Sequence, residues 1–346
     1  MSGSVFKYSA AGTKIRAMYS KLLTEKDYMH LISRKSVREV VEYLKKHTSY
    51  DKILSDINEN DVHRNELEIV FKESLFNDYN KIFHFINGNS RKFIEAVFLK
   101  NEMEDIKVLI GEIYTGRDNK FVLNSLVFLK KYSKLDYNKL IASRDLDQLI
   151  DNLKGTEYYR TLSFFKGRKE KSLFEMEMYM DISYLMSILK LKDTLTTGED
   201  NKLISMGLGM EIDIMNTMFI YRSKKLFNLP KEMVLNHVIP YWFRLKKEDL
   251  VKMAGSHDTN KFKDYIRKTF YGKIFSSDEE QLWEINSLNL LYEFYKGLLR
   301  KKQFSLGAII GYVHLKSMDI RNIITIIESV RYSLPEDEIK NIIIGM

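Results

Sequence analysis

The sequence predicts an all-α fold built from three similar helical modules, and three observations support this prediction. Only three prolines and 16 glycines occur in 346 residues, which leaves few positions for the turns of a β-rich fold. The tripeptide Thr-x-Tyr occurs three times, at residues 48–50, 156–158 and 269–271. Each copy is followed by a glutamate and then by an apolar–acidic pair. This order of motifs indicates a threefold internal repeat.

The spacing of the motifs defines the length of the repeat. The glutamates lie 20, 21 and 15 residues after the three threonines, at Glu68, Glu177 and Glu284. The apolar–acidic pairs follow 36, 36 and 35 residues later, at Met103-Glu104, Ile212-Asp213 and Met318-Asp319. A repeat of about 110 residues is large enough for a small core of its own, whereas a solenoid repeat has roughly 20–50 residues.

Turn-forming residues predict the boundaries between the modules. Gly116-Arg-Asp-Asn119 and Asn228-Leu-Pro230 both follow apolar helical segments. We therefore predict helical module 1 at residues 1–116, module 2 at residues 117–230 and module 3 at residues 231–346.

Each module is expected to begin with two short helices. The opening helices are predicted near residues 23–31, 135–140 and 245–250. The second helices are predicted to start at residues that can accept a hydrogen bond from an unpaired amide, namely Ser36, Asp145 and Asp258. Thr-x-Tyr is expected to close the second helix of each module.

A long helix and a terminal helix complete each module. Capping boxes predict the start of the long helix at Ser172-x-x-Glu175 and Ser277-x-x-Glu280. The terminal helix carries the apolar–acidic pair and an apolar stripe at helical spacing. In the third copy the stripe consists of Ile320, Ile323, Ile324, Ile327 and Val330. One face of each terminal helix is therefore expected to pack against its neighbours.

Composition narrows the class of protein. The absence of cysteine excludes disulfides, thiolate catalysis and cysteine-based zinc sites. The net charge of +8 permits attraction to nucleic acid, anionic lipid or an acidic protein and selects none of them. The N-terminal segment lacks a secretory apolar core, and the apolar stretch 320–327 is interrupted by Arg321 and too short to cross a bilayer. A soluble or peripheral membrane protein is expected.

The motifs contain no recognisable catalytic constellation. The seven histidines include no pair at the i, i+4 spacing of a helical metal site. The carboxylates Glu102 and Glu104 are two residues apart, so on a helix their side chains point about 200° from each other. Glu211 and Asp213 have the same spacing. We therefore expect no catalytic residue, no bound cofactor and no metal ligand.

The acidic motif is expected to anchor its helix. Asp213 with Asn216, and Asp319 with Asn322, have the i, i+3 spacing of local polar contacts. The two glycines of residues 206–210 lack the third glycine, the preceding strand and the lysine of a phosphate-binding loop, so this segment is expected to form a helix-entry turn.

Several of these segments together resemble a known family. They are Tyr8-x5-Lys14-Ile-Arg16, Glu211-Ile-Asp213-x-x-Asn216-x4-Tyr221-Arg222-x-Lys224, and the threefold repeat itself. This ordered set resembles the C subunit of the prokaryotic V/A-type ATPase, in a family that includes the d subunit of the eukaryotic V-ATPase. The similarity extends from about Phe6 to Ile343. In the first copy Lys107 replaces the asparagine of the other two copies, and Asp105 occupies the place where an asparagine is expected.

The resemblance implies a fold and a function. In this family three helical modules form a funnel around a pseudo-threefold axis. The funnel is a non-catalytic central-stalk (rotor) subunit, which couples the central shaft to the membrane ring of ion-carrying subunits and transmits torque for proton or sodium transport. The implied location is peripheral, on the cytoplasmic side of a membrane-bound complex. The implied partners are the shaft subunits and the ring, with no cofactor, nucleic acid or small-molecule substrate.

The cluster Arg222, Lys224 and Lys225 follows the second acidic motif, and we nominate it as a partner-binding surface; a solvated helix face is the alternative. The sequence leaves two other functions open. The basic and aromatic composition is compatible with a helical nucleic-acid-binding or scaffold protein, although the basic residues are dispersed along the chain. An all-α enzyme could assemble a carboxylate site from distant segments.

Overall fold

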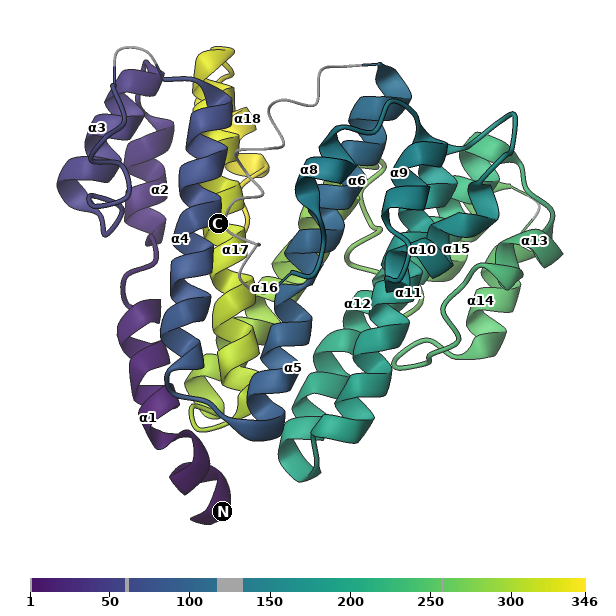
Figure 1. Cartoon of the computed structure of the whole chain (residues 1–346), viewed down its shortest axis with the longest axis horizontal. Helices are drawn as coiled ribbons and strands as arrows, with labels where there is room; N and C mark the ends of the chain where they lie inside the picture. Colours follow the sequence, from purple (N-terminus) through teal and green to yellow (C-terminus); the bar gives the residue numbers. More distant parts are fainter. Residues whose placement is uncertain (1, 60–61, 117–132, 257) are drawn as a thin grey trace. The chain divides into compact units, whose positions relative to one another are not determined.

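The computed structural model describes residues 2–59, 62–116, 133–256 and 258–346. In these ranges every regular element is a helix, and no strand occurs (Figure 1). The all-α prediction is confirmed for this part of the chain.

The predicted order of helices is present in each repeat. The opening helices are α2 (Glu25–Ile32), α8 (Tyr137–Ile141) and α14 (Lys247–Ala254). The second helices are α3 (Val37–His47), α9 (Leu146–Asn152) and α15 (Thr259–Ile266). The long helices are α4 (Arg64–Phe83), α11 (Leu173–Leu195) and α16 (Gln281–Lys301). The terminal helices are α12 (Gly198–Phe227), α17 (Leu306–Arg331) and, in the first repeat, the consecutive pair α5 (Gly88–Phe98) and α6 (Lys100–Thr115).

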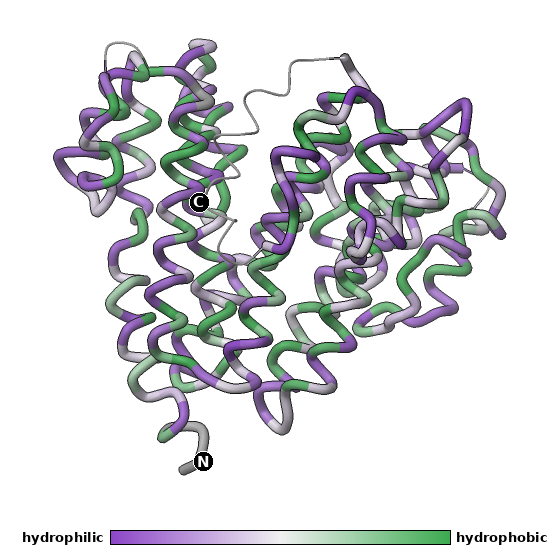
Figure 2. The backbone as a smooth tube through the Cα atoms, in the orientation of Figure 1, coloured by the Kyte–Doolittle hydropathy of each residue, from purple (hydrophilic) through white to green (hydrophobic). Residues whose placement is uncertain are grey.

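Shorter elements and one additional helix complete the described chain. They are α1 (Ser2–Tyr19), α10 (Glu157–Leu162), η2 (Ser163–Phe165), α13 (Lys231–Asn236) and α18 (Glu336–Asn341). Figure 2 shows hydrophobic and hydrophilic residues mixed along each helix, as expected when one face packs and the other is exposed.

Capping residues explain where several helices begin. Ser36 accepts a hydrogen bond from the Glu39 amide at 3.3 Å, and the Glu39 carboxylate in turn accepts one from the Lys35 amide at 3.0 Å. Ser172 caps α11 by accepting from the Glu175 amide. The prediction at Ser277 is wrong, because α16 begins four residues later. Glu280 does not complete a capping box there; its carboxylate binds Tyr221, Lys225 and Lys263.

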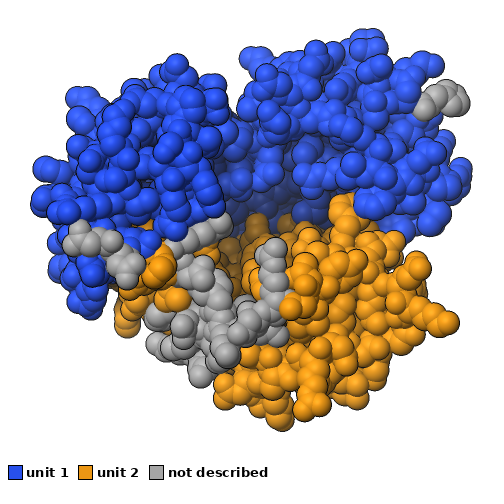
Figure 3. All heavy atoms as spheres, turned by 90° about the horizontal axis from the view of Figure 1, so that it is seen from above, with its two compact units in different colours: residues 1–62, 197–346 blue, residues 63–196 orange. Residues whose placement is uncertain are grey.

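The chain divides into two compact units, which Figure 3 distinguishes by colour. Unit 1 comprises residues 1–62 and 197–346, and unit 2 comprises residues 63–196. Unit 1 therefore contains the opening helices of the first repeat, the terminal helix of the second repeat and the whole third repeat.

Unit 1 is organised around two long terminal helices. Helix α17 packs against α16, α1, α2 and α3, and helix α12 packs against α14, α15, α16 and α17. The long helix and the terminal helix of the third repeat are also joined by an ion pair between Glu284 and Arg321 at 2.9 Å. Trp283 is fully buried between Tyr221 and Phe275 in this core.

Unit 2 is organised around α11. This helix packs against α5, α6 and α10, while α9 packs against α6. Lys107 on α6 forms an ion pair with Asp181 on α11 at 2.9 Å. Helix α4 contacts α5 through the rings of Tyr79 and Phe98, whose centroids are 4.4 Å apart.

The helix-entry turn predicted at residues 206–210 is wrong, because α12 continues through this segment without interruption. The glycines are required by the close approach of other segments. A Cβ atom on Gly209 would lie 2.6 Å from the Phe243 side chain, and one on Gly207 would lie 3.0 Å from the Tyr295 hydroxyl.

Helix α12 is also the single helix in the described ranges that is long and apolar enough to span a membrane. Within the molecule, 72% of its most apolar window is buried. The middle of the helix contains the buried polar residues Asp213 and Asn216. Its apolar character is therefore accounted for by packing against the surrounding helices of unit 1.

Candidate functional site

The terminal helix of the third repeat presents a buried carboxylate to tyrosines of the first repeat. Asp319 on α17 is only 3% exposed. Its Oδ1 accepts a hydrogen bond from the Tyr28 hydroxyl at 2.5 Å, and its Oδ2 accepts one from the Tyr50 hydroxyl at 2.5 Å. The Leu23 amide adds a contact at 3.3 Å. We call such a contact between an acid and the following repeat an acid–tyrosine junction.

A buried lysine completes this junction. Lys316 lies one turn before Asp319 on α17 and is 4% exposed. Its Nζ donates a hydrogen bond to the Tyr50 hydroxyl at 2.8 Å and lies 4.1 Å from the centre of the same ring. The positive charge offsets part of the cost of burying the Asp319 carboxylate.

The second repeat is joined to the third in the same way. Asp213 on α12 is 1% exposed, and its Oδ2 accepts a hydrogen bond from the Tyr271 hydroxyl at 2.9 Å. The same oxygen accepts the backbone amides of Arg244 at 2.7 Å and Leu245 at 3.1 Å. At this junction backbone amides provide part of the stabilisation of the buried carboxylate that Tyr28 and Lys316 provide at the Asp319 junction.

The first repeat is joined to the second through Glu102 on α6. The Tyr158 hydroxyl donates to Glu102 Oε1 at 2.9 Å, and the Tyr137 hydroxyl donates to Oε2 at 3.2 Å. The apolar–acidic pair Met103-Glu104 predicts Glu104 as the acid that anchors this helix, and that position is wrong. Glu104 is exposed and pairs with Lys107, because residues two apart on a helix point to different sides.

Asp105, which occupies the place of an expected asparagine, is also buried. It forms an ion pair with Lys72 of α4 at 2.8 Å. Burial raises the pKa of this carboxyl, and the nearby ammonium opposes that effect. In the first repeat a lysine on the long helix therefore compensates for the second buried acid.

The three junctions follow one pattern. Tyr158, Tyr271 and Tyr50 are the tyrosines of the three Thr-x-Tyr copies, and each contacts an acid of the preceding repeat. Contacts within unit 2 join repeat 1 to repeat 2. Contacts within unit 1 join repeat 2 to repeat 3 and repeat 3 back to repeat 1.

Two of the three threonines have the predicted local role; in the second copy the prediction is wrong, because Thr156 caps the start of α10 by accepting the Tyr159 amide at 3.2 Å. The Thr48 hydroxyl donates to the Leu44 carbonyl at 2.6 Å, and the Thr269 hydroxyl donates to the Ile266 carbonyl at 2.7 Å. Thr48 and Thr269 each accept the amide of the tyrosine two residues later, at 3.2 Å in both cases. In these two copies the turn follows the second helix and directs the tyrosine toward the acid.

The asparagines of the acidic motif make long-range contacts, so the prediction of local contacts is wrong. The Asn216 amide group both donates to the Ile239 carbonyl and accepts its amide, at 2.9 and 2.8 Å. Asn322 binds Ile344 in the same two ways, both at 2.9 Å. A carboxamide contains both N–H donors and an acceptor oxygen, so it can satisfy both backbone groups of a buried residue.

The electrostatics of the junctions favour a static role. Burial raises the pKa of the Asp319 carboxyl, while Lys316 and the tyrosine hydroxyls oppose the shift. Burial, together with the charge of Asp319, raises the pKa of Tyr28 and Tyr50 well above the usual range, so both remain protonated donors. The acid and its tyrosines are buried and engaged with one another. This arrangement suits a structural contact.

The nominated partner-binding residues lie at the end of α12. Lys224 Nζ donates to the Ala254 carbonyl at 2.8 Å, and burial lowers the pKa of this lysine. Lys225 forms an ion pair with Glu280. Arg222 is exposed. Two of the three cations therefore hold α12 to neighbouring segments, and Arg222 faces solvent.

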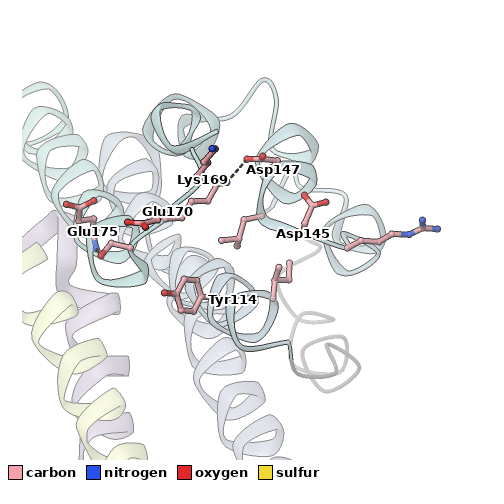
Figure 4. A pocket seen from close by; sticks show the side chains of 11 residues that line it. Tyr114, Asp145, Asp147, Lys169, Glu170 and Glu175 are labelled. Atoms are coloured by element: carbon pink, nitrogen blue, oxygen red, sulfur yellow. Dashed lines mark hydrogen bonds and ion pairs between the residues drawn. The ribbon is translucent and has the colours of Figure 1, made fainter. Parts of the chain in front are cut away.

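Unit 2 contains an open cavity of about 810 Å³ beside the start of α9. Figure 4 shows Tyr114, Asp145, Asp147, Lys169, Glu170 and Glu175 on its wall. Asp145 caps α9 by accepting the Gln148 amide, and Asp147 accepts the Gly167 amide and pairs with Lys171. These carboxylates are occupied by helix capping and loop attachment. Within the described ranges, no group of three or more acidic or histidine side chains converges as a metal site.

Replacing Asp319 with alanine tests the structural role of the junction. Asp319→Ala removes the acceptor of two buried hydroxyls and the counter-charge of Lys316, so we expect a loss of about 3–5 kcal/mol in the free energy of unfolding. Asp319→Asn keeps one acceptor oxygen and the side-chain shape and should lose less. Thermal unfolding followed by circular dichroism measures both.

Asp264→Ala is the matched control, because this aspartate lies on the exposed face of α15. It should change the free energy of unfolding by less than about 0.5 kcal/mol. Equal effects at Asp264 and Asp319 would contradict the structural role of the junction.

Comparison with known proteins identifies the family. The model of the family described as ATP synthase (C/AC39) subunit matches residues 11–342. The C subunit of the A-type ATP synthase of Methanosphaera stadtmanae is 25% identical over 98% of this chain and 88% of that protein. The protein of the same name from Archaeoglobus fulgidus is 23% identical over 97% of this chain and 95% of that protein.

The similarity is therefore not confined to one motif or one repeat. Because the family model spans nearly the whole chain, the protein belongs to the ATP synthase (C/AC39) subunit family.

Proposed function

We propose that this chain is a non-catalytic central-stalk (rotor) subunit of an A-type (V-type) ATP synthase, which connects the central shaft to the membrane ring and transmits torque for proton or sodium transport. The observation that carries the proposal is the match to C subunits of A-type ATP synthases over almost the entire length of both proteins. Family membership favours this role over a nucleic-acid-binding or scaffold protein.

The acid–tyrosine junctions give this proposal a physical basis. A part that transmits torque must resist the rotation of one module against the next. Each junction joins consecutive repeats through hydrogen bonds to a buried carboxylate, which are stronger than hydrogen bonds between neutral groups. The proposed ring of modules would hold each repeat on two sides. An open array would have a free repeat at each end.

The domain organisation in this proposal follows the repeat. We place module 1 at residues 1–116, module 2 at 117–230 and module 3 at 231–346, arranged as a funnel about a pseudo-threefold axis. One end of the funnel would bind the shaft subunits and the other would bind the ring of ion-carrying subunits. The protein would be peripheral to the membrane, on its cytoplasmic side, and would need no cofactor.

Depletion of the chain in its native host tests this role. A coupling subunit without catalytic function should be recovered from membranes together with the other ATP synthase subunits. Its depletion should abolish ATP-driven ion transport, while ATP hydrolysis by the catalytic head continues. Both activities are measured on inverted membrane vesicles, with transport followed by a pH- or sodium-sensitive dye. Normal coupling in depleted vesicles, or loss of hydrolysis by the detached head, would contradict the proposal.

Charge reversal tests the end of α12 as a partner-binding surface. Arg222 is the exposed member of the nominated cluster, whereas Lys224 and Lys225 also have internal contacts. Arg222→Glu should lower the recovery of shaft subunits by about fivefold at low salt, as expected when an ion pair worth about 1 kcal/mol is lost. The effect should weaken as the salt concentration rises.

Lys92→Glu is the control for this variant, because Lys92 is an exposed lysine on α5. Unchanged recovery of the shaft with Arg222→Glu would remove the α12 end from the proposed interface. The fold of both variants is checked by their thermal unfolding.

A further inference from the structure

We propose that an exposed aromatic–basic patch on the third repeat binds an acidic protein segment of a rotor partner and fixes the orientation of that partner on the threefold repeat. The patch consists of exposed residues of two segments that meet where Arg244 lies over Phe270, namely Trp242, Arg244, Lys246, Lys247, Lys268, Phe270 and Lys273. The inference rests on the proposed function, because it assumes a partner within the ATP synthase.

The centre of the patch combines exposed aromatic rings with a stacked arginine. Phe270 is 53% exposed and Trp242 is 40% exposed. The Arg244 guanidinium lies 4.9 Å from the centre of the Phe270 ring and 5.2 Å from that of Phe243. Tryptophan, tyrosine and arginine are the residue types that contribute most often to binding energy at protein interfaces.

The patch is attached to a rigid part of unit 1. Phe270 directly precedes Tyr271, whose hydroxyl binds the buried Asp213. The backbone amide of Arg244 binds the same carboxylate at 2.7 Å. Both sides of the patch are therefore held by one acid–tyrosine junction, so force applied to the patch would pass directly into α12.

The equivalent positions of the other repeats lack this cluster. Alignment on the first leucine of the opening helix and on the motif tyrosine places Leu245 opposite Leu23 and Leu135. Phe270 is then equivalent to Ser49 and Glu157. The Ser49 hydroxyl is used internally and donates to the Lys21 carbonyl at 2.8 Å. The Arg244 position is occupied by Leu22 in the first repeat and by Lys134 in the second.

The balance of basic and acidic residues also distinguishes the third repeat from the other two. Residues 242–248 and 268–273 contain five lysines or arginines and one acid. The equivalent segments 20–26 and 47–52 of the first repeat contain three cations and two acids. Segments 132–138 and 155–160 of the second repeat contain two of each. Within the described ranges, Lys247, Lys268 and Lys273 are exposed and form no ion pair.

This charge balance selects an acidic partner. Unpaired cations around exposed aromatic groups attract carboxylates and bring an approaching partner into register. A folded protein segment with acidic and apolar side chains would match both parts of the patch. Nucleic acid and anionic lipid share the negative charge and are distinguished by the cross-linking experiment.

A patch that the equivalent positions of the other two repeats lack has a mechanical consequence. Three equivalent modules offer three equivalent orientations to any partner, and torque transmission requires one of them to be fixed. A contact present in only one repeat stabilises one orientation over the other two by its whole binding free energy. The asymmetry of the patch would therefore set the angular position of the partner.

Site-specific photo-cross-linking in the assembled complex tests the inference. A photoreactive benzoyl-phenylalanine replaces Phe270 in the full chain, and the same residue replaces Ser49 in a matched control. Membranes containing the complete ATP synthase are illuminated, and the cross-linked peptides are identified by mass spectrometry. We expect Phe270 to cross-link to one protein subunit at a segment rich in aspartate and glutamate, and Ser49 to give no product with that segment.

A charge-reversal variant gives an independent measurement. Adding Lys268→Glu should reduce the Phe270 cross-link by about fivefold at low salt, as expected for an exposed ion pair worth up to about 1 kcal/mol. Added salt should reduce the difference between the two proteins.

Three results would overturn the inference: no protein cross-link from Phe270 in an intact complex, cross-links only to lipid or nucleic acid, or equal cross-linking of the same partner segment from Ser49. The proposed function fails separately, if the chain is absent from the purified ATP synthase. If the chain is recovered in the complex but Phe270 forms no cross-link, the proposed function is retained and the proposed binding role of the patch is rejected.

Discussion

The structure depends on one repeated interaction, in which a tyrosine hydroxyl of one repeat binds a buried carboxylate on the terminal helix of the preceding repeat. A buried carboxylate without partners is strongly unfavourable, so each acid constrains every group that surrounds it. The geometry of the threonine turn, the position of the short helices and the direction of the terminal helix must all be compatible with that contact. The three junctions satisfy the acid differently, with a lysine and two tyrosines at Asp319, backbone amides at Asp213, and two tyrosines at Glu102. The common requirement is a fixed relation between consecutive repeats.

This constraint relates the structure to a mechanical role. The acids and tyrosines of the repeat are the polar groups that the sequence would most readily suggest as catalytic, and they are buried against one another. Activity in such a protein resides in its exposed surfaces and in the stiffness of the connections between them. The exposed aromatic–basic patch is attached to the junction at Asp213, so binding at the surface and rigidity within unit 1 share the same residues. Under the proposed function, this direct attachment would suit the chain to transmit force.

Helix content, helix order and family were predictable from the sequence, because they follow from local patterns and from motifs in a fixed order. Capping residues such as Ser36 and Ser172 predicted helix starts, since their hydrogen bonds involve residues three positions away. The junctions were not predicted, because Tyr50 and Asp319 are 269 residues apart and nothing local specifies their contact. The repeat did contain a signal: both members of each pair recur at the same spacing, which is expected if they touch across repeats. The pattern of residue types predicted Glu104 as the acid of the first repeat, and that position is wrong. Glu102 is buried instead, because its side of α6 faces α8. The glycines of α12 led to a wrong prediction of a turn for a similar reason. Gly209 is required by the close approach of the Phe243 ring, which belongs to another segment.

A double-mutant cycle across the junctions tests the central claim most directly. Tyr50→Phe and Asp319→Asn are made singly and together, and the free energy of unfolding in urea is measured for each. The crossed pair Tyr50→Phe with Asp213→Asn joins residues of different junctions and serves as the reference. The account predicts an interaction energy of about 1 kcal/mol or more for Tyr50 with Asp319, and less than about 0.5 kcal/mol for the crossed pair. Additive effects for Tyr50 and Asp319, or equal coupling in the crossed pair, would contradict it.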